Sequence, residues 1–472
     1  MTRALQTLIV LGLALVTSAA PSWGQASVVV DDGIEFPDGS IQTAAAGIAQ
    51  TGQMKCYDRS GTTGDEARCY DFTEGEDGEA RPGYKWMSPR FIINGDATVT
   101  DTFTRLMWIQ DANCIETHYP GFDTDGTAGD GFVTWDNAFG FVAGMNLGTY
   151  SDCSAGYDDW RVPSFREMVS LVHHAWVDPA LCNTSCELQW TDGDPFTNLD
   201  VDATYWTSTT RVGAKTWAFA VDIGAAAPTT AIKTGVPPWP VWPVRDFTEP
   251  PASGSASIVL DDGGLEFDDG GVQDSAAAGT SPPVVLQTGQ TICYQTDGSE
   301  IACLGTGQDG ELLKGAEWPV PRFTDNGDGT VSDHLTGLVW LKDASCAGVP
   351  GWADALTFPK VLWDGSTLVG GGDCNIDDGS KEGDWRLPSI WELMSLLDYE
   401  YASPMVPNAM GDGQWSNGNP FINISTSAYY WSSTTSTDQP THAFAVNFGS
   451  GYAEAVLKTD SSPTAWVVRN GR

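Results

Sequence analysis

Cysteine is the residue type with the most chemical options in this sequence, which has ten cysteines in 472 residues. Thiolates act as nucleophiles or bind zinc, whereas thiols in an oxidising compartment form disulfides. The sequence contains no Cys-x-x-Cys pair and its five histidines are scattered, so the spacing does not favour a zinc site. We therefore expect structural disulfides and a protein that functions outside the cytoplasm.

The cysteines recur with a long internal repeat, whose offset of about 225 to 232 residues indicates a duplicated domain. Residues 90–108, RFIINGDATVTDTFTRLMW, return as residues 322–340, RFTDNGDGTVSDHLTGLVW. Residues 159–164, DWRVPS, return as residues 384–389, DWRLPS. A pairing that holds in both copies gives four disulfides and leaves a fifth, local one in the first copy: Cys56–Cys69, Cys114–Cys153, Cys293–Cys303, Cys346–Cys374 and Cys182–Cys186.

If the protein were an enzyme, its catalytic residues should recur in both copies. The most obvious candidates fail this test. The pair His173-His174 has Asp398 and Tyr399 as its counterparts, so we interpret it as a hydrogen-bonded pair at a helix end. The triplet that begins at Ser208 does recur, but it lacks both a G-x-S-x-G elbow and a repeated histidine, and we expect its hydroxyls to bond to backbone at a strand end. The sequence thus predicts no catalytic residue and no enzyme.

Calcium is the one cofactor for which the sequence offers ligands. Asp123, Asp125 and Asp130 lie in the loop PGFDTDGTAGDG, and their carboxylates are the hard oxygen ligands that calcium takes. The complete D-x-[DN]-x-[DN]-G-x5-E pattern is absent. The loop is therefore a candidate calcium site, with a solvated acidic insert as the alternative.

Tryptophan is abundant, with 20 residues, and its broad apolar face suits a ligand site as well as a core. We expect the tryptophans of the repeated motifs to be buried. The candidates for the rim of a ligand site are those that we place in unrepeated, variable loops: Trp190, Trp217, Trp363 and Trp415.

The secondary-structure elements that position these residues are expected to be short and to include both helices and strands. An Asn-Gly-Asp turn between apolar runs predicts an opening β-hairpin. A helix is expected from about residue 134, and a second follows the capping boxes Ser164-x-x-Glu167 and Ser389-x-x-Glu392. Aromatic and β-branched runs then predict strands. Each copy is expected to be α+β, with an opening β-hairpin, two short helices and an antiparallel meander.

The first residues have the composition of a secretory signal peptide, since Arg3 precedes an apolar run that is too short to span a membrane. No later segment of the sequence is predicted to span a membrane. The predicted organisation is a signal peptide (1–24), a stalk-like connector (25–55), a cysteine-closed hairpin (56–89), a first domain (90–246), a linker (247–256), a second connector (257–292), a second hairpin (293–321) and a second domain (322–472).

The second copy contains, in this order, RFTDNGDGTVSDHLTGLVWLKDASC, GDWRLPSIWELMSLLD, YYWSSTT, AFAVNFGSG and WVVRN. These motifs resemble the Lcl C-terminal domain family, the module that ends a Legionella collagen-like adhesin. The first copy resembles the family less closely. Its sequence differs from that of the second copy at Ile92-Ile93 and Ala97, and we expect it to contain an extra insert with Cys182 and Cys186. The resemblance implies two tandem C-type-lectin-like domains, related distantly to formylglycine-generating enzymes. The connectors resemble segments that precede surface and fibre modules, which leaves a homotrimer open.

The net charge of −39 and the pI of about 4.1 argue against nucleic acid and anionic lipid as partners. The adhesin of the family is associated with sulfated glycosaminoglycans, but this sequence lacks the necessary basic clusters, so sulfated polyanions are not expected as ligands. The sequence predicts a secreted or cell-envelope, adhesin-like binding protein for a glycan or a protein. The alternatives are a structural or fibre component that assembles through its repeated domains, and an enzyme on a formylglycine-generating-enzyme-like fold.

Overall fold

The computed structural model describes residues 47–58, 60–62, 66–67, 69, 75–122, 129–234, 238–247, 285–348, 350–366 and 374–471, and the strands of two short segments near residues 28–42 and 259–273. The predicted signal peptide lies outside the described residues. No described helix is long and apolar enough to cross a membrane. The chain divides into two compact units, of which the smaller comprises Met1–Ala44, Pro251–Ala278 and Arg472, and the larger Ala45–Pro250 and Gly279–Gly471.

The smaller unit contains only part of each predicted connector, residues 25–44 and 257–278, and the strands described in these two segments are arranged in the same way. Each forms a three-stranded antiparallel sheet whose strands follow one another in sequence. The strands are β1 (Val28–Val30), β2 (Gly33–Glu35) and β3 (Ile41–Gln42) in the first segment, and β13 (Val259–Asp261), β14 (Gly264–Glu266) and β15 (Val272–Gln273) in the second.

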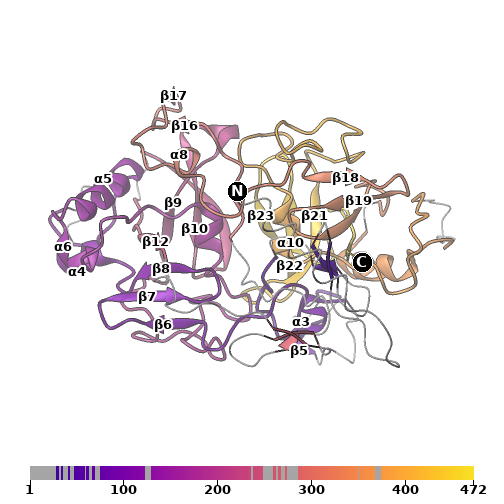
Figure 1. Ribbon diagram of the computed structural model, residues 1–472, viewed down its shortest axis with the longest axis horizontal. Coiled ribbons are helices and arrows are strands. Elements are labelled where there is room, and N and C mark those ends of the chain that lie inside the picture. Colours follow the sequence, from indigo (N-terminus) through magenta and orange to yellow (C-terminus); the bar gives the residue numbers. More distant parts are fainter. Residues whose placement is uncertain are drawn as a thin grey trace. The chain divides into compact units, whose positions relative to one another are not determined.

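The larger unit contains both copies of the repeat, and each copy is built on two antiparallel sheets (Figure 1). In the first copy, the four-stranded sheet has the order β6 (Phe91–Ile93), β7 (Thr98–Asp101), β8 (Leu106–Ile109) and β12 (Val244–Asp246). The three-stranded sheet is formed by β9 (Thr204–Thr210), β10 (Trp217–Asp222) and β11 (Ala227–Ile232). The helices are α4 (Cys114–His118), α5 (Trp135–Asn146), α6 (Ser151–Ser154) and α7 (Phe165–Val169), with a 3-10 turn η1 (Val212–Ala214).

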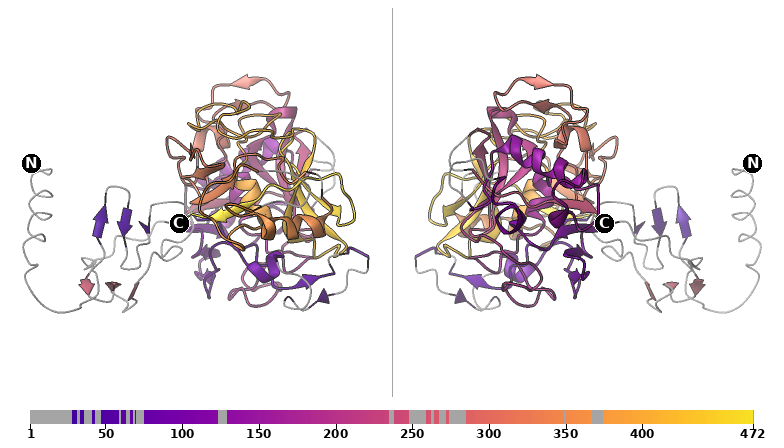
Figure 2. Two further views of the ribbon diagram at one scale, coloured as in Figure 1. Left: turned by 90° about the vertical axis from the view of Figure 1, so that its right-hand side faces the viewer. Right: turned by 90° about the vertical axis from the view of Figure 1, so that its left-hand side faces the viewer.

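The second copy has the same two sheets and fewer helices. Its sheets are β18 (Phe323–Asp325), β19 (Thr330–Asp333), β20 (Leu338–Leu341) and β24 (Val468–Asn470), and β21 (Tyr429–Thr435), β22 (His442–Asn447) and β23 (Ala453–Leu457). Its helices are α9 (Trp352–Thr357), the 3-10 turn η2 (Phe358–Val361) and α10 (Ile390–Ser395). Figure 2 turns this copy, orange to yellow, toward the viewer in its left panel and the first copy in its right panel.

The α+β class is confirmed, but the predicted arrangement of the last strand is wrong. We expected each copy to end as part of a meander, whereas β12 pairs with β8, with Val244 opposite Trp108, and β24 pairs with β20. The chain therefore returns to the opening sheet, in which the last strand and the first strand of the copy form opposite edges. The first copy also has more helices than the two that were expected, because α4 and α6 flank α5.

Local sequence signals explain the start of the central helix in each copy. At α7 the Ser164 side chain accepts a hydrogen bond from the Glu167 amide, and the Glu167 carboxylate accepts one from the Ser164 amide, at 3.3 and 2.8 Å. The same capping box begins α10, as predicted. α7 packs on β9 and β10, and α10 on β21 and β22, so each three-stranded sheet is covered by one short helix.

The tryptophans of the repeated motifs form the centre of each copy, as predicted. Trp108 and Trp242 are fully buried with their rings 5.4 Å apart, and Trp340 and Trp466 repeat this pair at 5.5 Å. Replacing one buried tryptophan by alanine in such a core typically costs about 3 to 5 kcal/mol. These rings are therefore structural, and the rim of a ligand site must be formed by other residues.

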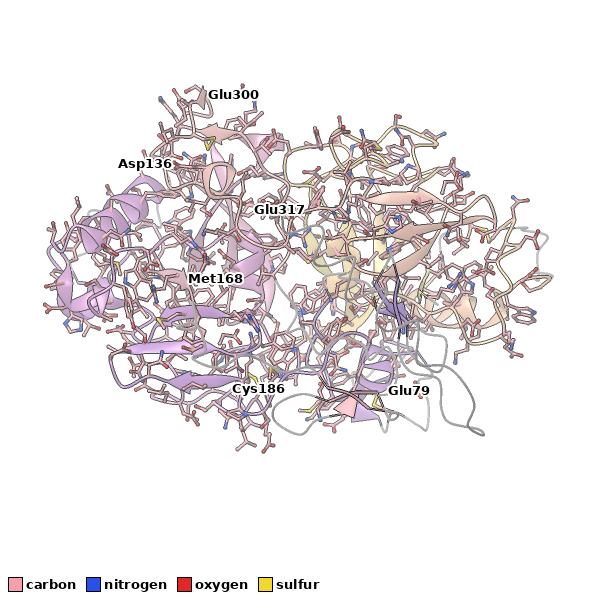
Figure 3. The ribbon with its side chains drawn as sticks, viewed as in Figure 1. Glu79, Asp136, Met168, Cys186, Glu300 and Glu317 are labelled. Carbon is pink, nitrogen blue, oxygen red and sulfur yellow. A yellow bond between two sulfur atoms is a disulfide. The ribbon has the colours of Figure 1, made fainter. Side chains whose placement is uncertain are left out.

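All ten cysteines are paired, in the combinations that follow from the repeat. The local pair Cys182–Cys186 does not lie in an insert, contrary to our expectation. The turn between Cys182 and Gln189 has the same length and the same closing bridge as the turn between Pro407 and Gln414 in the second copy. Figure 3 labels Cys186 beside the opening strands of the first copy. The first copy thus has a disulfide where the second has only hydrogen bonds.

The two cysteine-closed hairpins are exchanged between the copies. The first hairpin contains β4 (Cys56–Tyr57), β5 (Glu66–Ala67) and α3 (Asp77–Ala80), and α3 contacts β21 of the second copy. The second contains β16 (Cys293–Tyr294), β17 (Glu300–Ile301) and α8 (Asp309–Leu312), and α8 contacts β9 of the first copy. In Figure 1 the salmon β16 and α8 accordingly lie against the violet half of the unit. Each copy is therefore completed by the hairpin that precedes the other.

Candidate functional site

The repeated Thr-Gly-Gln and Ser-Thr-Thr motifs meet where a hairpin docks on the opposite copy. The Gln53 amide group both donates to the Thr435 carbonyl, at 2.7 Å, and accepts from the Thr435 amide, at 3.1 Å. Gln290 makes the same two contacts with Thr210, at 2.8 and 2.9 Å. Since such a two-point contact copies the pairing of a β-ladder, each glutamine extends the end of a strand in the opposite copy. The triplets at Ser208 and Ser433 are thus docking surfaces. The prediction that their hydroxyls bond to backbone holds only for these two serines, which donate to the carbonyls of Pro163 and Pro388.

A buried aspartate reinforces each of these contacts. Asp77 accepts hydrogen bonds from Thr51 and, across the copies, from Thr434, at 2.7 and 2.6 Å. Asp309 likewise accepts from Thr288 and Thr209. Burial raises the pKa of both carboxyls to about 6, even though the threonine hydroxyls lower it. The two aspartates occupy equivalent positions, and their hydrogen bonds join the copies rather than line an open cleft.

Buried ion pairs account for the other repeated polar motifs. Arg161 of the Asp-Trp-Arg motif contacts Glu167 at 2.6 Å and Asp246 at 2.5 Å, so it joins the start of α7 to the last strand. Burial alone would raise the pKa of Asp246, but Arg161 and Lys314 outweigh this effect and lower it. In the second copy, Arg386 contacts Glu392 at 2.6 Å. Because these charged groups pair with one another within the fold, few of the repeated ionisable groups remain available to a ligand.

Two buried lysines were missed by the sequence analysis. Lys233 lies over the Trp135 ring at 3.9 Å, and Lys458 lies over the Trp352 ring at 4.2 Å. Both touch the exchanged hairpins, since Lys233 donates to the Gln295 carbonyl and Lys458 to the Asp58 carbonyl, each at 3.4 Å or less. Burial lowers their pKa values, to about 7 for Lys233 and about 8 for Lys458. The signal that could have found them is the Lys-Thr pair that recurs at residues 233–234 and 458–459.

These lysines predict a rise in stability with alkaline pH. Their folded pKa values lie below the unfolded value of 10.5, so the unfolded chain binds more protons between about pH 7 and pH 10, and the free energy of unfolding should increase there. The slope has an upper limit of about 1.4 kcal/mol per pH unit for each lysine. The double variant Lys233→Met/Lys458→Met should flatten it in urea titrations at several pH values, whereas Lys215→Met, at an exposed lysine with a raised pKa, should not. An equal slope in all three proteins would contradict the assignment.

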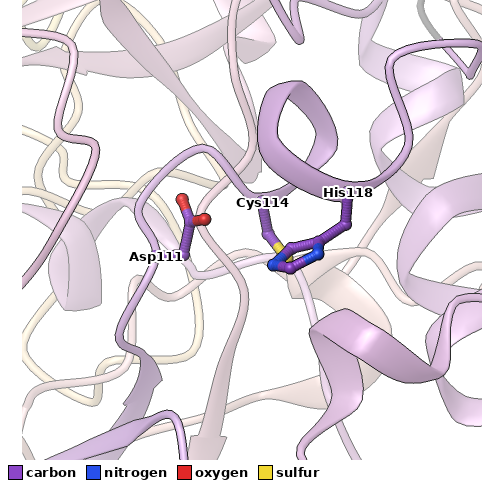
Figure 4. A group of neighbouring side chains, drawn as sticks. All are labelled: Asp111, Cys114 and His118. Carbon is purple, nitrogen blue, oxygen red and sulfur yellow. The ribbon is translucent and has the colours of Figure 1, made fainter.

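The described residues contain one cluster with the spacing of a metal site, formed by Asp111, Cys114 and His118 (Figure 4). Cys114 is joined to Cys153, so its sulfur is not a thiolate. The Asp111 carboxylate already accepts hydrogen bonds from the Asn113 amide and the Asn198 side chain, at 3.0 and 3.2 Å. The cluster therefore lacks the ligand set of a metal centre.

The predicted calcium loop is described only at its end. Asp123 and Asp125 lie outside the described residues. Asp130 is half-buried, and its carboxylate accepts a hydrogen bond from the Phe132 amide at 3.0 Å while its carbonyl accepts one from Asn113 at 2.8 Å. The calcium site stays a prediction.

The four rim tryptophans do not form one site. Trp190 and Trp415 occupy equivalent turns, in which each indole donates to the carbonyl of a phenylalanine six residues later, at 3.1 and 3.0 Å. Our placement of these two in unrepeated loops is therefore wrong. Trp217 lies on β10 opposite Ile232, so its placement in a loop is also wrong. Trp363 lies after η2, and both Trp217 and Trp363 are half-buried and have no tryptophan at the equivalent position. Of the four, these two remain the candidates that distinguish one copy from the other.

His173 and His174 are both buried. The His173 Nδ1 accepts a hydrogen bond from the Ala175 amide at 3.2 Å, whereas the His174 Nε2 has no partner among the described residues, so the predicted hydrogen bonding is wrong for His174. His174 packs on Phe444 of the second copy at 5.0 Å, and Tyr399, its counterpart, packs on Phe219 of the first copy at 4.9 Å. Burial lowers the pKa of His174 to about 3. The histidine therefore serves as a neutral ring between the copies.

Comparison with known proteins supports the repeat. The Lcl C-terminal domain family matches residues 97–245 and residues 329–469, which are the two copies described above. No curated protein and no solved structure matches the chain. The two matched regions cover more than half of the sequence. The chain therefore belongs to the Lcl C-terminal domain family and contains two tandem copies of that domain.

Proposed function

We propose that the protein is an exported, adhesin-like binding protein of the cell surface or envelope, which recognises a glycan or a protein through loops that differ between its two domains. The observation that supports this proposal is the position of the repeated polar motifs. Their arginines, aspartates and glutamines bind within a copy or between the copies, so recognition is left to the unrepeated loops. Five disulfides fit an oxidising compartment, where they fix the scaffold that carries these loops.

The test is a binding screen of the chain from Gln25 onward against a glycan array and a panel of extracellular proteins, with calcium and with chelator. For any ligand found, Trp217→Ala and Trp363→Ala should be compared, because a tryptophan at the centre of an interface contributes about 2 kcal/mol or more, or roughly 30-fold in affinity. Leu147→Ala is the control, since this side chain is 84% exposed at the end of α5. Binding that depends on calcium would direct mutagenesis to Asp123, Asp125 and Asp130.

Two results would contradict the proposal. If the protein binds nothing on the glycan array or in the protein panel and forms extended assemblies in light scattering, a structural or fibre component would be favoured over a binding protein. Titration of two or more free thiols in the denatured, unreduced chain would favour the enzyme alternative. A monodisperse monomer or trimer without free thiols agrees with a binding protein.

A further inference from the structure

The Cys182–Cys186 disulfide closes a turn that is also closed by hydrogen bonds. The Asn183 amide donates to the Leu188 carbonyl at 2.9 Å. The Gln189 side chain holds the end of the turn, because it donates to two backbone carbonyls at 2.7 and 3.0 Å. The bridge is therefore added to a turn that already has its own support.

The equivalent turn of the second copy has the same support and no bridge. The Asn408 amide donates to the Gly413 carbonyl at 2.7 Å, and the Gln414 side chain donates to two carbonyls at 2.8 and 2.9 Å. The positions of the two cysteines are occupied by Pro407 and Gly411. Hydrogen bonds alone thus fix this turn in one of the two copies.

The backbone at Cys186 favours glycine over cysteine. Its φ is 56°, and at the equivalent Gly411 φ is 82°, so both residues lie in the left-handed region. A side chain is unfavourable in this region, whereas glycine adopts it freely. The geometry of the turn therefore does not account for a cysteine at this position, and its sulfur chemistry is what sets it apart.

The bridge contributes little to the stability of the fold. Its cysteines are four residues apart, against 10 to 39 residues for the other four bridges, and a shorter loop loses less entropy when it is closed. Because such coupling is reciprocal, a bridge that stabilises the fold little is itself stabilised little by the fold. Thiols should therefore open this bridge more readily than the others.

The two sulfur atoms differ in access. Cys182 is fully buried in the hydrophobic core, whereas Cys186 is half-buried next to the exposed Glu187 and Leu188. An attacking thiolate from solution therefore reaches Cys186 and not Cys182. Other bridges also contain a half-buried cysteine, so the distinction of this one lies in a turn that keeps its shape when the bridge is open.

We propose that Cys182–Cys186 is a thiol-exchange site of the folded protein, at which a low-molecular-weight thiol forms a mixed disulfide with Cys186. The thiolate attacks the Cys186 Sγ, the bond to Cys182 breaks, and the Cys182 sulfur leaves with the electron pair and takes a proton from water. A second thiol then attacks the small-molecule sulfur and displaces Cys186. Two molecules of thiol are oxidised to one disulfide, and the bridge is reduced to two protein thiols.

This site is independent of the loops proposed to recognise a glycan or a protein. Without added thiol the bridge stays closed, so the proposal adds no free thiols to the oxidised chain.

The experiment is native-state reduction of the full mature chain with cysteamine, with free thiols trapped by N-ethylmaleimide and located by peptide mass spectrometry. Cysteamine is the probe because it is cationic, and an anionic thiol would be repelled by the net charge of −39. The first product should be a mixed disulfide at Cys186 with a free Cys182, formed about tenfold or more faster than any product at another bridge. The near-ultraviolet circular dichroism spectrum should stay native.

Two double variants test whether the fold needs the bridge. Cys182→Ala/Cys186→Gly keeps the hydrogen bonds of the turn and should have a urea midpoint close to that of the wild-type protein. Cys114→Ala/Cys153→Ala is the matched control and should lower the midpoint clearly, because this buried bridge spans 39 residues.

Three results would overturn the proposal: another bridge opens before Cys182–Cys186, the native spectrum is lost as Cys182–Cys186 opens, or the mixed disulfide forms at Cys182 instead of Cys186. An equal fall of the midpoint in the two double variants would also contradict it. Mapping of the wild-type chain requires no substitution, so it decides the question if a variant does not fold.

Discussion

Residues 45–250 and residues 279–471, expressed separately, are expected to give no stable folded monomer. Each half lacks the hairpin that completes it and exposes the rings that pack between the copies, such as Tyr399 against Phe219. Exposing one fully buried large apolar side chain costs about 1.5 to 3 kcal/mol, and a domain is stable by only about 5 to 15 kcal/mol. The loss of several such contacts is therefore comparable to the whole stability of one half.

The two halves should recover the native fold when they are produced together. Light scattering is expected to show a one-to-one complex of the co-expressed halves, whereas a single half should be unfolded or form a dimer with itself. The intact chain, cleaved after Pro250 at an introduced protease site, is the control and should stay associated under native conditions. A folded monomeric half with the denaturation midpoint of the intact chain would show that the exchange of hairpins contributes nothing.

Arg161→Met is expected to lose about 3 to 5 kcal/mol of the free energy of unfolding, because it leaves the buried Glu167 carboxylate without its cation, whereas Asp246 keeps Lys314 at 2.7 Å. Glu167 accounts for this cost, since its side chain is only 2% exposed. The loss should be partly recovered in Arg161→Met/Glu167→Gln, in which the glutamine keeps the capping box and removes the buried charge. Urea denaturation of the wild-type, single and double variants forms the cycle that measures this coupling.

The second copy offers a matched comparison for this cycle. Arg386 is 18% exposed, against 7% for Arg161, and contacts Glu392 together with the neutral Asn470, so the ion pair that Arg386→Met breaks is less completely buried than the one at Arg161. We expect a smaller loss from Arg386→Met than from Arg161→Met. If the losses of Arg161→Met and Glu167→Gln simply add up to the loss of the double variant, with no recovery, the result would contradict the buried ion pair at Arg161.

The parts of the fold that could be predicted from the sequence are those encoded over short distances. The capping boxes at Ser164 and Ser389 are complete within four residues. The pairing of the cysteines followed because a duplicated pattern leaves few consistent choices. Burial of the repeated tryptophans followed from their apolar neighbours.

Relations between distant segments could not be predicted in the same way. The repeat shows that Gln53 and Gln290 are equivalent, but it gives the same pattern whether a hairpin docks on its own copy or on the other. The last strand was placed wrongly for a related reason, because an apolar run such as Val241–Val244 fits the edge of either sheet. Lys233 and Lys458 were missed because a lysine is normally exposed, and only the surrounding Trp135 and Trp352 show that they are not.

The exchange of hairpins also bears on how the protein tolerates dilution. Two separate chains that completed each other in this way would dissociate as their concentration fell, as it does for a protein released from a cell. Joining the copies in one polypeptide makes the encounter intramolecular, so the connecting segment, and not the concentration of the protein, sets the effective concentration of one copy at the other. The paired state then forms at any concentration of the protein, so a symmetric partnership between two domains survives where a dimer of single domains would not.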